Sequence, residues 1–360
     1  LAGNGSTVVV SNGTYAINSQ ILLTRAINLR GLTGDFDDVI IDAQNQCRTL
    51  KVATAGACVS GITFKRGRNS SVSGGYVYGG TVSNCRFTAQ NMVNQGGASE
   101  FGYTTTLACD NGTLVDCVVD NSDFHEMYRT RKPFGYFYLR CGGFAERCVV
   151  TNNTNTGHNN TGGSLGKSGS TGVFISNGTL RNSLVANNRM LKPNSQDPNI
   201  IGGGAYLNAG RIENCTIVTN TIVENTNLTY YAYYALYNHQ GAVVNTIVAD
   251  HWALENAANP GTAYPCGYVT GVFTNSCLPG AAELPGAKNI ESVGATTYAF
   301  DSDARLLFPF PLSPCQNRGL NEPWMTDAVD LHGNRRIFGP RVDIGCLECQ
   351  RSAGTVITVR

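Results

Sequence analysis

The sequence predicts an all-β protein, a right-handed parallel β-helix of about ten coils, and three observations lead to this fold class. A phrase that begins with Gly recurs roughly every 30 residues. Within each copy apolar and polar residues alternate, as in a strand with one buried face. The composition, with 42 Gly and only 14% charged residues, favours turns and strands over helices. A unit this short cannot bury its apolar face alone, so consecutive units must stack.

The repeated phrase reads Gly, any residue, apolar, any residue, usually Asn, a small residue, any residue, apolar. Its copies begin at Gly80, Gly112, Gly143, Gly178, Gly210, Gly241 and Gly271. Because stacked coils place equal positions above one another, the Asn position predicts a side-chain amide ladder. The ladder residues are Asn84, Asn182, Asn214, Asn245 and Asn275. The next position predicts an inward column of mostly small residues: Ile62, Cys85, Cys117, Cys148, Ser183, Cys215, Thr246 and Ser276.

Two strands and their turns account for the shortest coil, so we expect the extra residues of longer coils to emerge as loops on one face. A second strand ladder is expected at Tyr76, Ala108, Leu139, Phe174, Tyr206 and Tyr237. The longest insertions are Asn121–Tyr136, Asn152–Thr171, Met190–Ile201 and Asn220–Ala235. Further strands are expected at Val8–Val10, Ile27–Leu29, Val39–Ile41 and Leu50–Val52.

Two regions are predicted, coils over residues 1–278 and an irregular C-terminal capping region over residues 279–360. In the second region the repeated Gly phrase no longer occurs and Pro becomes frequent. A cap is needed because the last coil would otherwise expose a strand edge.

The 13 cysteines have two predicted roles. Those in the inward column are expected to be buried free thiols, because free Cys packs as a small apolar residue. Disulfide candidates are Cys109 with Cys141, Cys266 with Cys277, and Cys315 with Cys346 or Cys349. The last two have a metal-like spacing but lack a second ligand pair, so neither a metal nor a cofactor is predicted.

The C-terminal region carries a specific pattern. Ser313-Pro-Cys-Gln-Asn-Arg-Gly319 is followed by Asp330-Leu-His-Gly-Asn-Arg-Arg336 and then by Val342-Asp-Ile-Gly-Cys-Leu-Glu348. It resembles the closing signature of bacterial right-handed β-helix surface proteins of the choice-of-anchor class, with Cys346 in place of Ala. The coils are also similar to polymorphic outer-membrane protein repeats. The resemblance implies export and display at the bacterial cell surface, and it implies no reaction.

The insertion after Asn121 combines basic groups with aromatic rings. This combination suits an acidic polysaccharide, because guanidinium groups bind carboxylates while rings stack on sugar faces. The predicted ligand-binding residues are Tyr128, Arg129, Arg131, Lys132, Tyr136, Tyr230, Tyr233, Tyr234 and His239. The two stretches, 123–140 and 230–239, would border one groove. In the alternative interpretation the aromatic residues cover the flank of the rod and the charges are solvated.

The leading hypothesis is an exported surface protein, extracellular or at the bacterial cell surface, that acts in adhesion or glycan binding without catalysis. The rival is a polysaccharide lyase or glycoside hydrolase acting on an acidic polysaccharide, although the motifs of polygalacturonases and pectate lyases are missing. For a lyase the candidates are His125, Arg129, Arg131, Lys132 and Arg140.

A third hypothesis is a structural subunit that stacks end to end through Thr7–Val10 and Thr355–Val359. The expected partner is a polysaccharide or cell-surface glycan. The net charge of +1 gives no reason to expect nucleic acid. Because no apolar run reaches 18 residues, no transmembrane helix is predicted.

Overall fold

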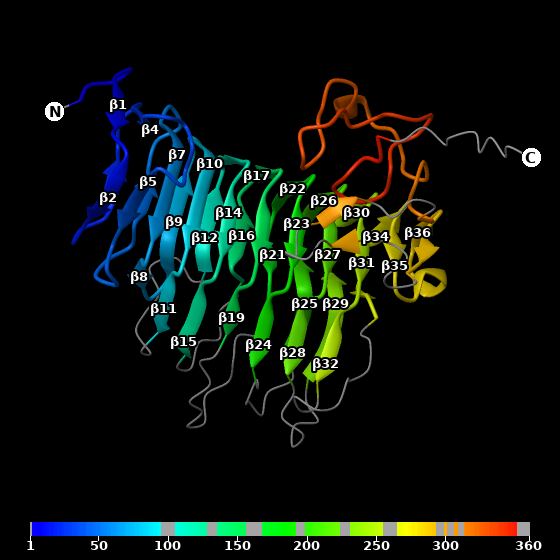
Figure 1. Cartoon of the computed structure of the whole chain (residues 1–360). Helices are drawn as coiled ribbons and strands as arrows, with labels where there is room; N and C mark the ends of the chain where they lie inside the picture. Colours follow the sequence, from blue (N-terminus) through cyan, green and yellow to red (C-terminus); the bar gives the residue numbers. More distant parts are fainter. Residues whose placement is uncertain are drawn as a thin grey trace, which may run out of the picture.

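The chain forms a right-handed parallel β-helix, which confirms the fold class (Figure 1). The computed structural model describes residues 2–94, 105–127, 135–155, 168–191, 199–223, 231–254, 265–292, 299–300, 306–308 and 313–350. Each coil pairs in parallel with the next, as β1 (Thr7–Val10) does with β4 (Asn28–Gly31). In the described part of the chain, no helix is both long and apolar enough to cross a membrane.

Two columns of strands form one twenty-stranded sheet, and β7 and β10 run through both. The first column stacks β1, β4, β7 (Cys58–Lys65), β10 (Thr81–Thr88), β13 (Thr113–Val115), β17 (Gly143–Glu146), β22 (Gly178–Arg181), β26 (Gly210–Glu213), β30 (Ala242–Val244), β34 (Val272–Thr274) and β36 (Gly286–Ala287). The second stacks β2 (Gly13–Ala16), β5 (Val39–Asp42), β7, β10, β14 (Val118–Asp120), β18 (Val149–Thr151), β23 (Leu184–Ala186), β27 (Thr216–Val218), β31 (Ile247–Ala249), β35 (Cys277–Leu278) and β37 (Ile290–Glu291).

Two further sheets close the coil. The seven-stranded sheet contains β8 (Arg68–Asn69), β11 (Asn91–Asn94), β15 (Asp123–Met127), β19 (Thr154–Asn155), β24 (Arg189–Leu191), β28 (Thr221–Val223) and β32 (Trp252–Leu254). The ten-stranded sheet contains β3 (Ile21–Leu23), β6 (Leu50–Val52), β9 (Val72–Tyr78), β12 (Thr105–Asp110), β16 (Phe137–Arg140), β20 (Ser168–Ser170), β21 (Val173–Ile175), β25 (Asn199–Leu207), β29 (Tyr231–Asn238) and β33 (Gly267–Tyr268). Outside these sheets lie the antiparallel pair β38 (Ala299–Phe300) and β39 (Leu306–Phe308), and the 3₁₀ turns η1 (Ala281–Glu283) and η3 (Pro323–Met325).

The four strands predicted near the N-terminus are confirmed as β1, β4, β5 and β6. The coil nevertheless has four strand positions rather than the two predicted, because the Gly phrase bends into both columns and the long insertions contain the strands of the seven-stranded sheet. These strands are short and lack apolar alternation, as in Thr154–Asn155, so their sequence resembles a loop. Most of the remaining insertion residues lie outside the described residues, so a single face for the insertions stays a prediction.

The predicted Asn position forms the bend between the first and second columns. Its residues adopt the left-handed conformation, with φ between 46° and 54°: Asn84, Asp116, Arg147, Asn182, Asn214, Asn245 and Asn275. Asn is favoured there because it tolerates a positive φ better than other residues with a side chain. We call this bend the left-handed corner.

The predicted amide ladder at the left-handed corner is wrong. One amide-to-amide hydrogen bond joins the predicted ladder residues, from Asn245 Nδ2 to Asn214 Oδ1 at 3.3 Å. The ladder lies instead at the opposite bend, before the seven-stranded sheet. There Asn153 Nδ2 donates to Asn188 Oδ1 at 2.9 Å, and Asn188 Nδ2 donates to Asn220 Oδ1 at 2.8 Å. These three side chains are fully buried, so we call this bend the inner ladder.

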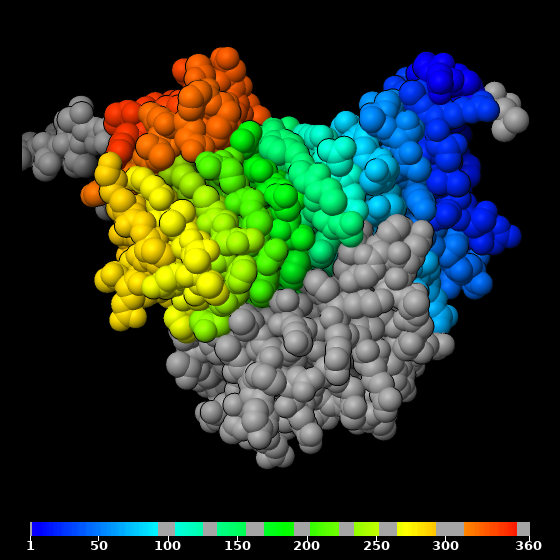
Figure 2. Space-filling view, turned by 180° about the vertical axis from the view of Figure 1, so that it is seen from behind, coloured from blue at the N-terminus to red at the C-terminus, as the bar shows by residue number. Residues whose placement is uncertain are grey.

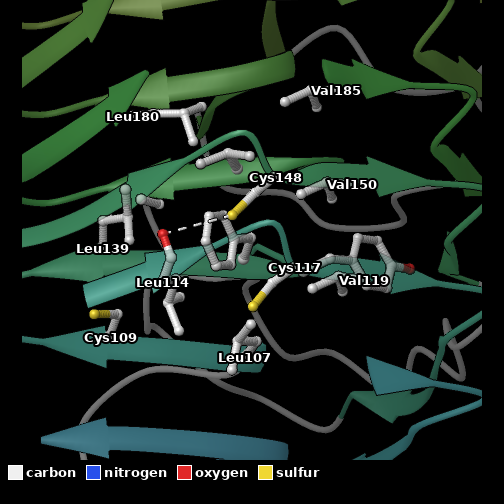
Figure 3. Packing of buried hydrophobic residues seen from close by; sticks show 14 of the residues in the cluster. Leu107, Cys109, Leu114, Cys117, Val119, Leu139, Cys148, Val150, Leu180 and Val185 are labelled. Atoms are coloured by element: carbon white, nitrogen blue, oxygen red, sulfur yellow. Dashed lines mark hydrogen bonds between the residues drawn. The ribbon is translucent and has the colours of Figure 1, made fainter. Parts of the chain in front are cut away.

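The predicted inward column is confirmed, and its cysteines are buried free thiols (Figure 3). Cys148 Sγ donates to Leu114 O of the preceding coil at 3.9 Å and to Glu146 O at 3.4 Å. Ser183 makes the equivalent contact, with Oγ donating to Arg181 O at 2.6 Å and accepting the Cys148 amide at 3.0 Å. Small residues with a donor fit this position because each satisfies a carbonyl beside the bend.

An aromatic column follows the outer face of the ten-stranded sheet, largely as predicted. Tyr138 stacks on Phe174 with ring centroids 5.1 Å apart, Phe174 on Tyr206 at 4.9 Å, and Tyr206 contacts Tyr237 at 5.2 Å. Tyr138 occupies the place predicted for Leu139, which points into the core. These rings are buried, so this part of the molecule agrees with the interpretation in which aromatic residues cover the flank.

Residues 313–350, the C-terminal segment, lie along the side of the rod rather than over its last coil (Figures 1 and 2). The coils continue through β36 and β37, which pair with β34 and β35. The segment docks on the left-handed corner, whose amides donate to its carbonyls. The pairs are Asn182 with Val329, Asn214 with Asp343, Asn245 with Leu320 and Asn275 with Arg318, at 3.1, 3.5, 2.9 and 2.9 Å.

The signature residues of this segment form a buried polar network. Arg336 is fully buried and donates from Nη2 to the carbonyls of Asp343 at 3.0 Å and Gly345 at 2.5 Å. Glu348 accepts the Asp343 amide at 2.9 Å, and the Glu348 amide donates to Asp330 at 2.9 Å. Burial raises the pKa of the Glu348 carboxyl to about 7, with repulsion from Asp343 as the next cause. The signature therefore has a structural role.

All 13 cysteines are free in this structure. The predicted pairings of Cys109 with Cys141, Cys266 with Cys277, and Cys315 with Cys346 or Cys349 are therefore not formed. Cys109 is buried in the main core whereas Cys141 is exposed, and Cys266 belongs to the main core whereas Cys277 lies in the apolar cluster beneath the C-terminal segment.

Candidate functional site

A polar pocket of about 420 Å³ opens in the first coils of the rod. Its lining comes from the turn before β3, the turn before β6 and strand β8. The lining residues are Ser19, Gln20, Gln46, Cys47, Arg48, Arg68 and Asn69. The pocket thus lies at the edge between the seven-stranded and ten-stranded sheets, from which the long connections leave in later coils. Here the connections are short, and the edge is open.

Arg48 forms the floor of the pocket, and its guanidinium is held by oxygens of the preceding and the following coil. Nε donates to Val72 O at 2.9 Å, Nη1 donates to Gln20 Oε1 at 3.2 Å, and Nη2 lies 3.5 Å from Asn69 Oδ1. The residue is only 4% exposed. A guanidinium stays charged at all relevant pH values, so Arg48 brings a fixed positive charge to the pocket.

Arg68 stands at the rim of the pocket and is exposed. Its backbone amide donates to Cys47 O at 2.9 Å, which fixes β8 against the preceding coil. Asn69 beside it accepts the amide of Ser71 at 2.9 Å. The two arginines therefore hold different positions, one at the floor and one at the mouth, on neighbouring coils.

The lining chemistry suits binding rather than bond cleavage. Neither a carboxylate nor a histidine occurs among the lining residues, so they supply no general acid–base pair. Burial raises the pKa of the Cys47 thiol. Guanidinium, amide and hydroxyl groups together match the carboxylate and hydroxyl groups of an acidic sugar. Within the described residues, no group of three or more His, Cys, Asp or Glu is arranged to hold a metal ion.

The residues predicted for ligand binding are described only in part. Five of them lie outside the described residues: Tyr128, Arg129, Arg131, Lys132 and Tyr230. His125 lies in β15 and Tyr233 in β29, and the structure describes their backbone alone. For these seven residues the predicted roles stay predictions.

Tyr136 is not at the surface, which corrects its assignment to a ligand groove. Its side chain is 0% exposed and stacks on Phe124 inside the coil, with ring centroids 4.2 Å apart. Strand alternation alone would place Tyr136 on the same face as Tyr138, which belongs to the outer aromatic column. Tyr136 lies just before β16, however, and there its side chain packs in the main core. A ring enclosed by the core cannot stack on a sugar.

Arg140, Tyr234 and His239 lie on the ten-stranded sheet or beside it. Arg140 Nε is 3.8 Å from Asp110 Oδ2 and 3.2 Å from Cys141 Sγ, so this lyase candidate is engaged in local contacts. Tyr234 is half-buried, with its ring 5.1 Å from that of Tyr237. The strand register places Arg140 and His239 three coils apart on this sheet, about 14 Å at roughly 4.8 Å per coil.

The pocket was not predicted from the sequence. Arg48 and Arg68 are separated by one short coil. Arg48 precedes β6, which was predicted, and Arg68 begins the short strand β8. Arranging the N-terminal coils by their strands would have placed these arginines on adjacent levels. Without that alignment, two isolated arginines do not indicate a binding site, because surface arginines are common.

Comparisons with known proteins found solved structures that are similar to this chain at low sequence identity. No family model matches this sequence, and no curated protein matches it. The resemblance to choice-of-anchor surface proteins therefore stays a prediction. A solved structure of the pectate lyase Pel9A is similar, with a TM-score of 0.40 and 12% identity over 96% of this chain and 88% of that one. An alginate lyase complexed with a trisaccharide has a TM-score of 0.33 and 10% identity over 86% and 87% of the chains.

Proposed function

We propose that this protein binds an acidic polysaccharide and that the pocket around Arg48 and Arg68 holds one carboxylate-bearing sugar. The observation that carries the proposal is the pairing of two guanidinium groups with amide side chains in one open pocket. Arg68 at the rim meets the carboxylate, and Gln20 and Asn69 meet the hydroxyl groups. The chain of the ligand runs along the sheet edge, toward the connections that carry the predicted Arg and Tyr residues.

The location of the pocket supports a polymer as ligand. The pocket is open and lies on an edge that continues along the rod, so a chain extends from it without turning. Binding outside the cell, as the C-terminal resemblance implies, agrees with a cell-surface or extracellular polysaccharide. A lyase remains the alternative, and its candidates Arg129, Arg131 and Lys132 lie outside the described residues.

Titration calorimetry of the full chain against polygalacturonate, alginate and a neutral glucan tests the proposal. We expect binding to at least one uronic-acid polymer, none to the glucan, and a roughly 5- to 10-fold weaker affinity for Arg68→Gln, about 1 kcal/mol. Arg30→Gln is the matched control, because it removes the same charge from an exposed residue of the first column. Equal affinities of the Arg68→Gln and Arg30→Gln variants would show that the polymer does not bind at the pocket.

The same samples test the catalytic alternative. A lyase creates unsaturated sugar ends, and their ultraviolet absorbance rises with time. Absorbance that stays constant in the presence of a bound polymer supports binding without cleavage. Turnover that is lost on substitution of Arg129, Arg131 or Lys132 would establish the lyase instead.

A further inference from the structure

Two cysteines meet where the C-terminal segment docks on the coils. Cys277 belongs to β35 in the second column, and Cys315 is among the first residues of the segment. Both are 0% exposed and lie in one apolar cluster with Ile344, Cys346 and Leu347. This cluster is separate from the main core, and its members from the coils are the outward side chains of the second column.

The two thiols approach from opposite sides, which a disulfide requires. Cys277 projects outward from the coil, one residue after Ser276 of the inward column, and Cys315 reaches it from the segment. Their side chains contact each other, and this contact together with burial raises the pKa of the Cys315 thiol. Cys117 and Cys148 also contact each other. They occupy equal positions of stacked coils, so their Cα–Cβ bonds are parallel and suit packing better than bridging.

We propose that Cys277 and Cys315 form a disulfide that fastens the C-terminal segment to the rod. The bond forms by exchange with a small-molecule disulfide such as oxidised glutathione. The thiolate of one cysteine displaces one glutathione and forms a mixed disulfide, and the thiolate of the other then displaces the second. The two cysteines lose two protons and two electrons, and the reagent leaves as two thiols.

The burial of the pair determines when this exchange takes place. Exchange needs a thiolate that the reagent can reach, and a reagent cannot reach two thiols that are 0% exposed in the folded protein. The bond therefore forms while the segment is still undocked, during folding. Once formed, it restricts the chain between the last coils and the segment that carries the Arg336 network.

Oxidative refolding tests the proposal. The reduced, denatured chain is refolded in a buffer of reduced and oxidised glutathione, alkylated in denaturant and digested with trypsin. We expect a linked pair of peptides spanning residues 212–288 and 306–318. The folded, reduced protein in the same buffer is expected to yield no such linked pair over the same time, because only exposed thiols such as Cys141 can exchange with the reagent.

Variants separate this bond from other pairings. Cys277→Ser and Cys315→Ser each abolish the linked peptides, whereas Cys117→Ser, which removes an inward-column thiol, keeps them. Circular dichroism confirms that each variant has refolded. The proposal is overturned if the refolded wild type retains 13 free thiols, or if Cys315 is linked to Cys346 or Cys349 instead.

Discussion

Two bends of the coil, the left-handed corner and the inner ladder, carry asparagines in several coils, yet the asparagines have different roles there. At the left-handed corner, Asn245 and its equivalents supply a backbone with positive φ, and their amides face the C-terminal segment. At the inner ladder, Asn188 and its neighbours are fully buried and bond to one another from coil to coil. The first bend therefore selects Asn for its conformation, and the second selects it for its hydrogen-bonding groups.

The difference has an energetic consequence. A residue chosen for positive φ has a good substitute in Gly, which reaches that conformation without strain. A buried amide that both donates and accepts has no such substitute, because its removal leaves neighbouring polar groups unsatisfied. The inner ladder should therefore tolerate substitution less well than the left-handed corner.

The largest effect is expected from Asn188→Ala. The Asn153 amide and Asn153 Nδ2 then each lose a bond to Asn188 Oδ1, and Asn220 Oδ1 and Val150 O lose the bonds from Asn188 Nδ2. The loss of these four buried hydrogen bonds, at about 1 kcal/mol each, lowers the free energy of unfolding by about 4 kcal/mol. Urea denaturation followed by circular dichroism measures the change. A loss below that of Asn84→Ala would refute the ranking of the two bends.

A second effect concerns the segment that covers the left-handed corner. Burial raises the pKa of Glu348 to about 7 from an ordinary value of 4.5, so the folded state binds the proton more tightly than the unfolded state. The stability that this group contributes is fully present below pH 4.5 and is lost as the pH rises through 7, by up to about 3 kcal/mol.

Unfolding measured between pH 4.5 and 7.5 tests this linkage. Glu348→Gln is expected to flatten the dependence on pH, because the side chain no longer titrates. Glu283→Gln is the control, since it removes an exposed carboxylate from η1 and should leave the slope unchanged. Parallel pH profiles of wild type and Glu348→Gln would contradict the raised pKa.

The smallest effects are expected at the left-handed corner, and they separate conformation from hydrogen bonding. Asn84 is the corner residue to test, because it is half-buried, whereas Asn245 is fully buried and both donates to and accepts from Leu320. Asn84→Gly keeps the positive φ and loses the bond from Nδ2 to Gly34 O, for a cost of about 1 kcal/mol. Asn84→Ala also forces a Cβ into the left-handed region, for roughly 1 kcal/mol more. Thermal unfolding of both variants gives the difference. Equal stabilities would mean that the conformation does not select Asn at this bend.

Much of the coil was predictable because its determinants are local and repeated. The Gly phrase predicted the strands of both columns. Its small-residue position, as at Cys148 and Ser183, predicted the inward column. The site was not predictable in the same way. Arg48 and Gln20 meet across neighbouring coils. Tyr136 is buried in the core because it precedes β16, where the alternation that sets the face of Tyr138 does not apply.

The sequence by itself determined a parallel β-helix, the positions of the bends and the burial of the thiol column, because each follows from a pattern repeated within one coil. Only the tertiary structure decided which bend holds the amide ladder and where residues 313–350 dock. It also decided that Arg48 and Arg68 line one pocket and that Cys277 faces Cys315. These features depend on contacts between residues that no local pattern relates, as between Asn182 and Val329. Such contacts are selected by packing of the folded chain rather than by the preferences of any one segment.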